Sequence, residues 1–194
     1  MKKYVTNLEP NSFYHIFNKG INGNKIFFSS QNYSYFLKLL KDKVLSVSGI
    51  YAYCFLPNHF HILIKTKSEN EIRESFSEKA QIDVDKIISQ QFSNVFNSYT
   101  QAVNKNYSRT GKLFELPFRR RLITSDDYLI KTILYIHNNP KKHFLTNEIF
   151  SYQHSSLPQI LNNNQNGKIT KEIISLFGSL DNFRLLHQNY DPIK

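Results

Sequence analysis

The chain contains 194 residues, of which 40% are hydrophobic, and its 25 lysine and arginine residues against 15 aspartate and glutamate residues give a formal charge of +10. The single cysteine excludes an internal disulfide and any zinc site built from several cysteines, and no apolar run approaches the roughly 20 residues that span a bilayer. The positive charge favours a polyanionic partner, because lysine and arginine side chains that neutralise phosphates release condensed counterions. We therefore expect one main domain of a cytoplasmic protein with no membrane partner.

The first third of the chain predicts a strand, a helix and a β-hairpin. Ser29 and Ser30 are typical of a helix start, and the pair Pro57-Asn58 is typical of the tight turn between two antiparallel strands. In chain order, the predicted elements are a strand at 12–19, a helix at 31–46, a strand at 50–56 and a strand from the turn to about residue 67.

The remainder of the chain predicts more helix than strand. Residues 68–90 are polar and are expected to hold a short helix and a loop. Ser125, Asp126 and Asp127 mark a helix start, and Pro140 is expected to end that helix because the residue before a proline avoids the α region. In chain order, the further elements are a helix at 93–106, a strand at 118–124, a helix at 128–138, an asparagine-rich linker at 161–167 and short helices at 171–177 and 182–188. This order indicates an α+β sandwich built on an antiparallel sheet.

Two histidines, His59 and His61, flank one apolar residue in the second strand of the predicted hairpin. Because successive side chains of a strand point to opposite faces, both imidazoles project from one face, about 7 Å apart along the strand. Two imidazoles on a rigid strand can chelate a divalent cation. Two ordinary half-exposed strand histidines would give the same spacing, so the spacing leaves both interpretations open.

A basic segment follows the second long helix, and aromatic residues are interleaved with it. Five basic residues fall within thirteen positions, and they are Arg109, Lys112, Arg119, Arg120 and Arg121. Tyr107, Phe114 and Phe118 lie close to them in the sequence. Aromatic rings with cations suit single-stranded nucleic acid, whose bases stack while its backbone is neutralised. A solvated basic loop is the alternative.

Tyr135 and Asn139 lie one helical turn apart, near the end of the third long predicted helix. Positions i and i+4 differ by about 40° around a helix, so the phenol and the amide share a face. They could serve as nucleophile and metal ligand, or as a core tyrosine beside a capping asparagine. By spacing alone, Tyr128 is a second candidate for the nucleophile, since it lies two turns earlier on nearly the same face. Lys141 and Lys142 could hold flanking phosphates or form a solvated pair.

The ordered combination of these segments resembles the single-tyrosine HUH transposases, and among them the REP-associated tyrosine transposases, which are relatives of the transposase of insertion sequence 200. The resemblance rests on the segments Pro57–Ile64, Phe96–Phe114 and Tyr135–Pro140, and on the opening Tyr14–Gly20. It covers about residues 10–158. It implies an HUH nuclease domain at 1–158, followed by a linker and short helical tail at 159–194.

The resemblance also implies a fold and a set of site residues. The family fold is a ferredoxin-like or RRM-like sandwich, with a central antiparallel sheet that carries the histidine strand and with helices on one side. The two metal histidines of the family fall on His59 and His61, its nucleophilic tyrosine on Tyr135, and its third, amide-bearing ligand on Asn139. The implied cofactor is a divalent cation, Mg²⁺ or Mn²⁺.

The implied activity is site-specific cleavage and rejoining of single-stranded DNA through a 5′-phosphotyrosine intermediate, with hairpin-forming repeat ends as the DNA partner and the nucleoid as the place of action. Relatives act either as homodimers that exchange tyrosines or as monomers, and the sequence leaves both open. Three other interpretations remain: a domesticated hairpin-binding module that does not cut, an RNA-binding protein of RRM-like architecture, and a replication-initiating HUH nuclease. The sequence identifies no general base, and His137 is expected to face away from Tyr135.

Overall fold

A computed structural model describes residues 6–76, 81–162 and 167–191 of the chain. Four strands form one antiparallel sheet in the order β2-β3-β1-β4. The strands are β1 (Phe13–Lys19), β2 (Ser48–Leu56), β3 (His59–Thr66) and β4 (Arg119–Ile123). The predicted hairpin is therefore confirmed as β2–β3, and the histidine strand occupies an inner position of the sheet.

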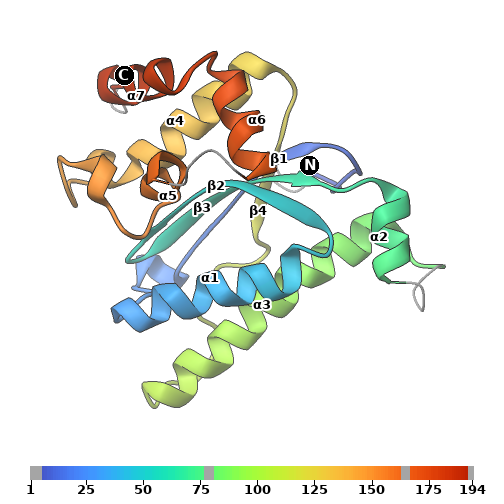
Figure 1. Cartoon of the computed structure of the whole chain (residues 1–194). Helices are drawn as coiled ribbons and strands as arrows, with labels where there is room; N and C mark the ends of the chain where they lie inside the picture. The colour runs from blue at the N-terminus through green and yellow to red at the C-terminus, as the bar shows by residue number, and fades with distance from the viewer. Residues whose placement is uncertain (1–5, 77–80, 163–166, 192–194) are drawn as a thin grey trace.

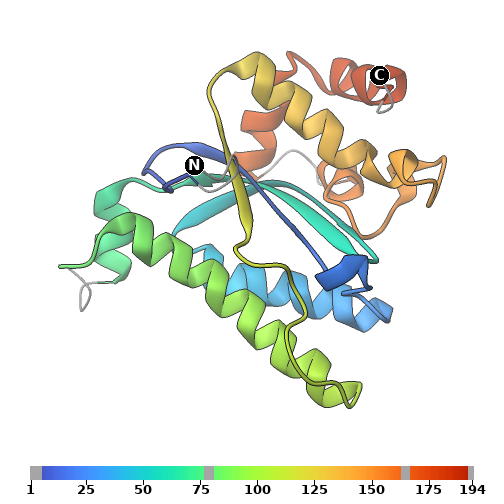
Figure 2. The same cartoon turned by 180° about the vertical axis from the view of Figure 1, so that it is seen from behind.

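Helices cover both faces of this sheet (Figures 1 and 2). One layer consists of α1 (Ser30–Val44) and α3 (Val84–Asn106), with the short α2 (Glu69–Ser75) packed against α3. The other layer consists of α4 (Asp126–Lys142), α5 (Leu157–Asn162), α6 (Lys168–Leu176) and α7 (Leu180–Asn189). Two short 3₁₀ turns, η1 (Ile21–Gly23) and η3 (Ile149–Ser151), complete the described elements. The predicted α+β sandwich is confirmed, but the expectation of helices on one side only is wrong.

The second helical layer exists because β3 is apolar on both of its faces. Phe60, Ile62 and Ile64 are fully buried in the hydrophobic cluster under α1 and α3. Leu63 is fully buried in the cluster under α4. Since side chains alternate along a strand, His59 and His61 share the face of Leu63 and lie on the α4 side.

Two helices extend beyond their predicted ends. α3 begins at Val84 rather than at 93, and its additional turns bury Val84, Ile87 and Ile88 under the sheet. α4 continues through Pro140 to Lys142, although Pro140 was expected to end it. The proline is buried, and the turn around it is closed by the His143 amide, which donates to the Asn139 carbonyl at 3.0 Å. Packing of the proline here outweighs its local preference to end a helix.

The C-terminal helices contribute to the same core as α4. Ile173 of α6, together with Phe177 and Phe183, lies in the cluster that also contains Ile133 and Ile136 of α4. The sequence missed α5, and residues 163–166 of the predicted linker lie outside the described residues. The division of the chain at residue 158 stays a prediction. In the ranges that the structure describes, no helix is long and apolar enough to cross a bilayer.

Candidate active site

The strand register gathers histidines and arginines on one face of the sheet. Residues directly opposite each other in neighbouring strands point to the same face. The opposed sets are Phe17 with His61 and Arg119, His15 with Leu63 and Arg121, and Lys19 with His59. α4 packs on this face over β2 and β3, so the imidazoles of β3 lie under the helix, while Arg119 and Arg121 of β4 line a cavity beside it.

Tyr135 of α4 stands directly over the histidine strand. Its ring centroid is 5.3 Å from that of His61 and 6.1 Å from that of His15, in edge-to-face arrangements. The ammonium group of Lys142 lies 4.8 Å from the centroid of the Tyr135 ring. The helix therefore brings a phenol and a positive charge to the two histidines that share a face, His59 and His61, whose own ring centroids are 5.3 Å apart.

Asn139 lies one turn further along α4 and carries an unpartnered buried oxygen. Its Nδ2 donates to the Tyr135 carbonyl at 2.7 Å, which fixes the orientation of the amide. Its Oδ1 is buried and has no hydrogen-bond partner among the described residues. Burial lowers the pKa of His59, and the nearby Asn139 amide opposes that lowering, although its oxygen does not reach His59 with hydrogen-bond geometry. Asn138 carries a second such oxygen, but adjacent helix positions differ by about 100°, so it faces elsewhere.

The histidines of this face are held in the neutral form. Burial lowers the pKa of His59 to about 4 and that of His15 to about 3, and it lowers the pKa of His61 well below its ordinary value. Neutral imidazoles keep the lone pair that a metal ion requires. In the described part of the chain, no three His, Cys, Asp or Glu side chains are placed to hold a metal ion together. A donor set here would thus consist of two imidazoles and the Asn139 amide oxygen, whose missing partner fits that role.

Two adjoining cavities open on the sides of this cluster. One, of about 360 Å³, is lined by His15, His61, Tyr135 and the arginines of β4 that share their face. The other, of about 280 Å³, is lined by His59, Asn58, Lys19, Arg119 and His143. Because His61, Phe17 and Arg119 line both, the two cavities form one cleft with the histidines at its middle.

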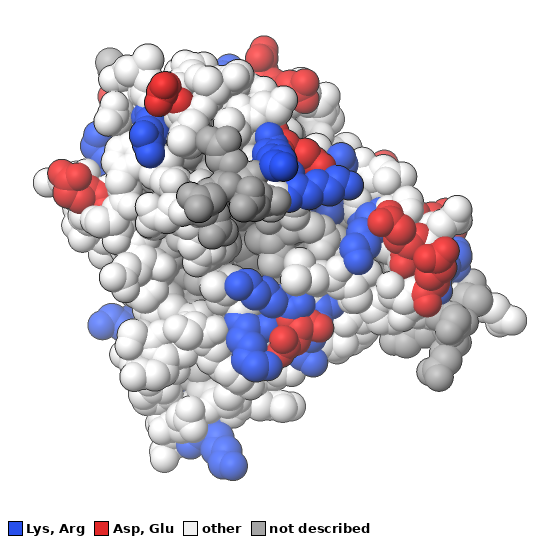
Figure 3. All heavy atoms as spheres, viewed as in Figure 1, with Lys and Arg blue, Asp and Glu red and all other residues white. Residues whose placement is uncertain are grey.

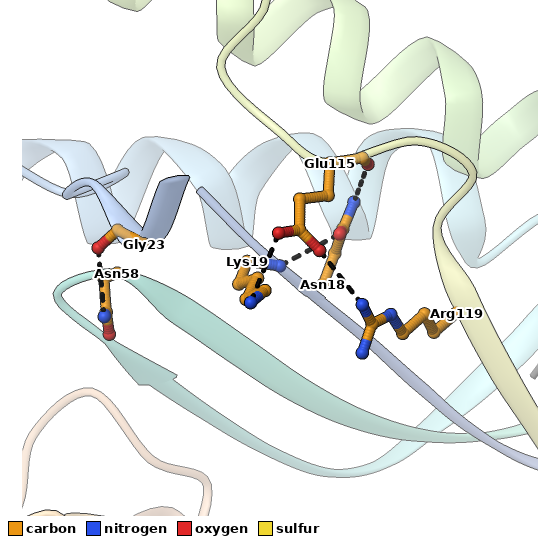
Figure 4. A network of polar contacts seen from close by, with 6 residues as sticks. All are labelled: Asn18, Lys19, Gly23, Asn58, Glu115 and Arg119. Atoms are coloured by element: carbon orange, nitrogen blue, oxygen red, sulfur yellow. Dashed lines mark hydrogen bonds and ion pairs between the residues drawn. The ribbon is translucent and has the colours of Figure 1, made fainter. Parts of the chain in front are cut away.

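Glu115 forms ion pairs with two basic side chains, Lys19 and Arg119, at the edge of this cleft. Its carboxylate lies 3.2 Å from Lys19 Nζ and 3.0 Å from Arg119 Nη2, and Asn18 Nδ2 donates to its backbone carbonyl at 2.9 Å (Figure 4). These contacts fix the position of Arg119 without filling the cavity that it lines.

The structure separates the basic residues that the sequence grouped together. Arg119 and Arg121 line the cleft, while Arg120 points to the opposite face, where it donates to the Thr6 carbonyl and, at 3.1 Å, to Ser89 Oγ. Arg109 donates to Asn104 at 3.0 Å, at the end of α3. Neither Arg109 nor Lys112 nor Lys141 lines either cavity. On the face shown in Figure 3, the basic and acidic side chains of the described residues are interspersed and form no continuous basic patch.

Several residues of the cleft were not predicted as site residues, and three of them are aromatic or imidazole rings close to the predicted ones. His15 lies against His61, the ring of His143 lies 4.6 Å from that of His59, and Tyr190 lines the cavity that contains Tyr135. The alternation of β1 could have placed His15 on the correct face, but its neighbour depends on a strand pairing that the sequence does not reveal. His137 faces away from Tyr135 as expected, since its ring bonds His187 and Ser156.

Solved structures show how this arrangement compares with known proteins. The structure of a REP-associated tyrosine transposase bound to a REP hairpin aligns with 84% of this chain and 87% of its own chain, at a TM-score of 0.63 and 15% identity. The chain has the fold of a REP-associated tyrosine transposase. The resemblance inferred from the motifs is thereby confirmed at the level of the fold.

Weaker likenesses exist to a bacterial tRNA(His) guanylyltransferase (Thg1)-like protein in complex with GTP or ATP. These two structures align with 73% and 72% of this chain and with 68% and 62% of their own, at TM-scores of 0.47 and 0.46 and 15% identity. Likenesses this low support no argument about function. No protein-family model and no protein of curated function matches the sequence.

Proposed function

We propose that this protein cleaves and rejoins single-stranded DNA, with Tyr135 as nucleophile and with a divalent cation held by His59, His61 and Asn139. The observation that carries the proposal is the placement of Tyr135 over His61, with the unpartnered Asn139 oxygen one turn further along the same helix. Nucleophile and candidate ligands come from two elements far apart in sequence. Tyr135, His59 and His61 line the cleft, and Asn139 is buried one turn from Tyr135. The fold, which is that of a tyrosine transposase, supports the same role.

The proposed reaction is a transesterification at phosphorus. The Tyr135 oxygen attacks the scissile phosphate and loses its proton, the bond to the 3′-oxygen breaks, and that oxygen leaves as a hydroxyl after taking up a proton. The 5′ end stays attached to the enzyme as a phosphotyrosine, and attack by a 3′-hydroxyl reverses the step and rejoins a strand. Arg119 and Arg121 line the same cavity as Tyr135, where their charges would stabilise the phosphate oxygens.

The candidate donor set suits Mn²⁺ and Mg²⁺. Mixed nitrogen and oxygen donors accept manganese readily, and the amide oxygen suits both ions. A bound cation would supply Lewis-acid stabilisation of the phosphate. His59 and His61 lie on one strand, and burial lowers the pKa of both, so their lone pairs would be available to the cation at neutral pH.

The proposed DNA partner is a single-stranded hairpin from repeat ends. The net charge of +10 suits a polyanion, and the transposase with the same fold was solved with a REP hairpin. Tyr135 lies against His61 of the same chain, with ring centroids 5.3 Å apart, and this contact supports a nucleophile that acts in cis.

A denaturing-gel adduct assay tests this proposal. Labelled single-stranded hairpins from DNA flanking the gene are incubated with the protein and Mn²⁺ or Mg²⁺, using wild type, Tyr135→Phe and the matched control Tyr128→Phe, whose ring lines the same cavity. We expect a slow-migrating covalent band that chelator and Tyr135→Phe abolish and Tyr128→Phe retains. Tight hairpin binding without any band would indicate the non-cutting module. Equal affinity for RNA and DNA without cleavage would indicate the RNA-binding alternative.

A further inference from the structure

We infer that Asn58 and His15 are positioning residues: Asn58 dictates that Nδ1 of His59 carries the proton, and His15 accepts the proton of His61 Nδ1 when a cation is bound, so that both Nε2 atoms are available to the cation. The inference rests on the proposed function, since it concerns the ligands proposed there. Each of the two histidines has its Nδ1 atom engaged by a different neighbour. His59 Nδ1 lies 2.7 Å from Asn58 Oδ1, and His61 Nδ1 lies 2.9 Å from His15 Nε2.

The tautomer of His59 follows from the orientation of the Asn58 amide. Asn58 Nδ2 donates to the Gly23 carbonyl at 3.2 Å (Figure 4). Turning the amide over would set two carbonyl oxygens against each other, so Oδ1 must be the atom that faces His59. An amide oxygen only accepts hydrogen bonds, and His59 Nδ1 must therefore carry the proton. The lone pair of His59 then lies on Nε2.

The contact between His61 and His15 permits two tautomers of His61, and cation binding selects one of them. One of the two facing nitrogens donates and the other accepts, since two neutral imidazoles share the bond. If His61 binds a cation through Nε2, its proton is on Nδ1 and is donated to His15 Nε2. His15 then carries its own proton on Nδ1. A histidine that ligates a metal characteristically donates its second nitrogen in this way, which fixes the ring orientation and raises its basicity.

The sheet and its turns hold His15 and Asn58 in place. His15 is only 9% exposed, and its ring lies 4.9 Å from that of Phe17. In the β1–β3 ladder, Phe17 is directly opposite His61, so His15 reaches His61 along the diagonal. Asn58 belongs to the β2–β3 turn and is tied to the η1 turn through Gly23. Both positioning residues thus come from the sheet and its turns, and neither comes from α4.

Two variants at each position test the inference through Mn²⁺ affinity, measured by electron paramagnetic resonance of the free ion. His15→Leu and Asn58→Ala remove the acceptor, and we expect each to weaken Mn²⁺ binding roughly 10- to 100-fold. His15→Gln and Asn58→Asp keep an acceptor oxygen and should restore most of the affinity. His154→Gln, which alters a histidine stacked on Tyr33 outside the site, is the matched control and should bind as wild type.

A second measurement needs no substitution. Long-range ¹H–¹⁵N correlation of the imidazole nitrogens distinguishes a protonated from an unprotonated ring nitrogen, and metal-free wild type should show His59 protonated on Nδ1. A proton on Nε2 of His59 would overturn the inference, as would wild-type Mn²⁺ affinity in both His15→Leu and Asn58→Ala. If His15→Leu fails to fold, the Mn²⁺ affinities of Asn58→Ala and Asn58→Asp and the nitrogen spectrum of the wild type still test the inference. A wild type that binds no Mn²⁺ at all would overturn the metal-dependent function together with the inference.

Discussion

The Asn139 side chain donates a hydrogen bond to the backbone carbonyl of Tyr135, so the candidate third ligand is fastened to the candidate nucleophile. The bond orients the amide with its oxygen unpartnered and buried. A buried amide oxygen without a partner costs roughly 1–3 kcal/mol. Binding of a cation to the Asn139 oxygen would offset this cost.

Substitution at Asn139 should raise the metal concentration that adduct formation needs and leave the affinity for hairpin DNA unchanged. We expect Asn139→Leu to raise the Mn²⁺ concentration for half-maximal adduct formation by at least about tenfold, because one of three donors is lost. Asn139→Asp keeps an oxygen donor and should remain close to wild type. A Mn²⁺ titration of the adduct assay measures both, and hairpin affinity measured without metal should be unaltered. Equal metal dependence in wild type and Asn139→Leu would remove Asn139 from the donor set.

Substitution of Arg121 on β4 should slow adduct formation, whereas substitution of its neighbour Arg120 should lower stability. Arg121→Gln removes a charge from the cleft, and we expect adduct formation to fall by about 10- to 100-fold, which corresponds to the roughly 1.5–3 kcal/mol of a charge-assisted hydrogen bond. Arg120→Gln, on the opposite face, should keep its adduct rate. Instead it should lower the free energy of unfolding by about 1 kcal/mol, because the Thr6 and Ser89 contacts are lost.

Adduct kinetics and urea denaturation of both arginine variants together measure this contrast. If Arg120→Gln reduced cleavage as strongly as Arg121→Gln, the assignment of the two faces to different roles would be refuted.

Stability should fall in mild acid because of the buried pair His137 and His187. Burial lowers the pKa of His187 to about 4 and that of His137 well below its ordinary value, while an unfolded histidine has a pKa near 6.5. Above pH 6.5 both states hold these rings neutral, and the stabilisation is complete. Below it, the unfolded chain binds protons that the folded chain does not, so the free energy of unfolding declines between about pH 6.5 and 4.

For His187 alone, this decline amounts to roughly 3 kcal/mol over that range. Urea denaturation at several pH values between 7.5 and 4.5 measures it. His187→Gln should be less stable at neutral pH and should show a shallower decline, since one of the titrating groups is gone. An identical slope in wild type and variant would assign the acid sensitivity to other groups, such as His15 and His59, whose pKa values burial also lowers.

Two phenylalanines offer a matched test of the core. Phe36 is fully buried between α1 and the sheet, while Phe144 is 85% exposed. Phe36→Ala should cost about 3–5 kcal/mol of unfolding free energy, because it removes a ring and leaves a cavity. Phe144→Ala should change it by no more than about 0.5 kcal/mol. Chemical denaturation compares them directly, and a large loss in Phe144→Ala would show that its loop is packed in solution.

The sequence predicted those parts of the fold and site that depend on local pattern. The β2–β3 hairpin, the shared face of His59 and His61 and the start of α4 at Ser125, whose side chain accepts a bond from the Tyr128 amide, all follow from alternation and capping. Alternation along β4 could also have separated Arg120 from Arg119 and Arg121. The placement of Tyr135 over His61 was expected only through the family resemblance.

The parts that the sequence could not predict depend on tertiary packing. Local preference placed the end of α4 before Pro140, but the buried ring lets the helix continue. The contact between His15 and His61 depends on the pairing of β1 with β3, which the chain order does not determine. The second helical layer follows from the burial of both faces of β3. The sequence did not reveal this burial, because His59 and His61 make one face of the strand look half-polar.

Because Tyr135 and Asn139 share α4 while His59 and His61 stay on β3, any tilt of the helix alters two distances at once. A tilt that carried an attached DNA strand away from the sheet would also withdraw one of the three donors from the other two. Displacing the attached strand and loosening the ion would then be a single mechanical event, with the phosphotyrosine bond still intact. Under the proposed function, exchange of the metal ion would therefore be fastest while the tyrosine is displaced, and ion turnover would be coupled to the progress of strand transfer.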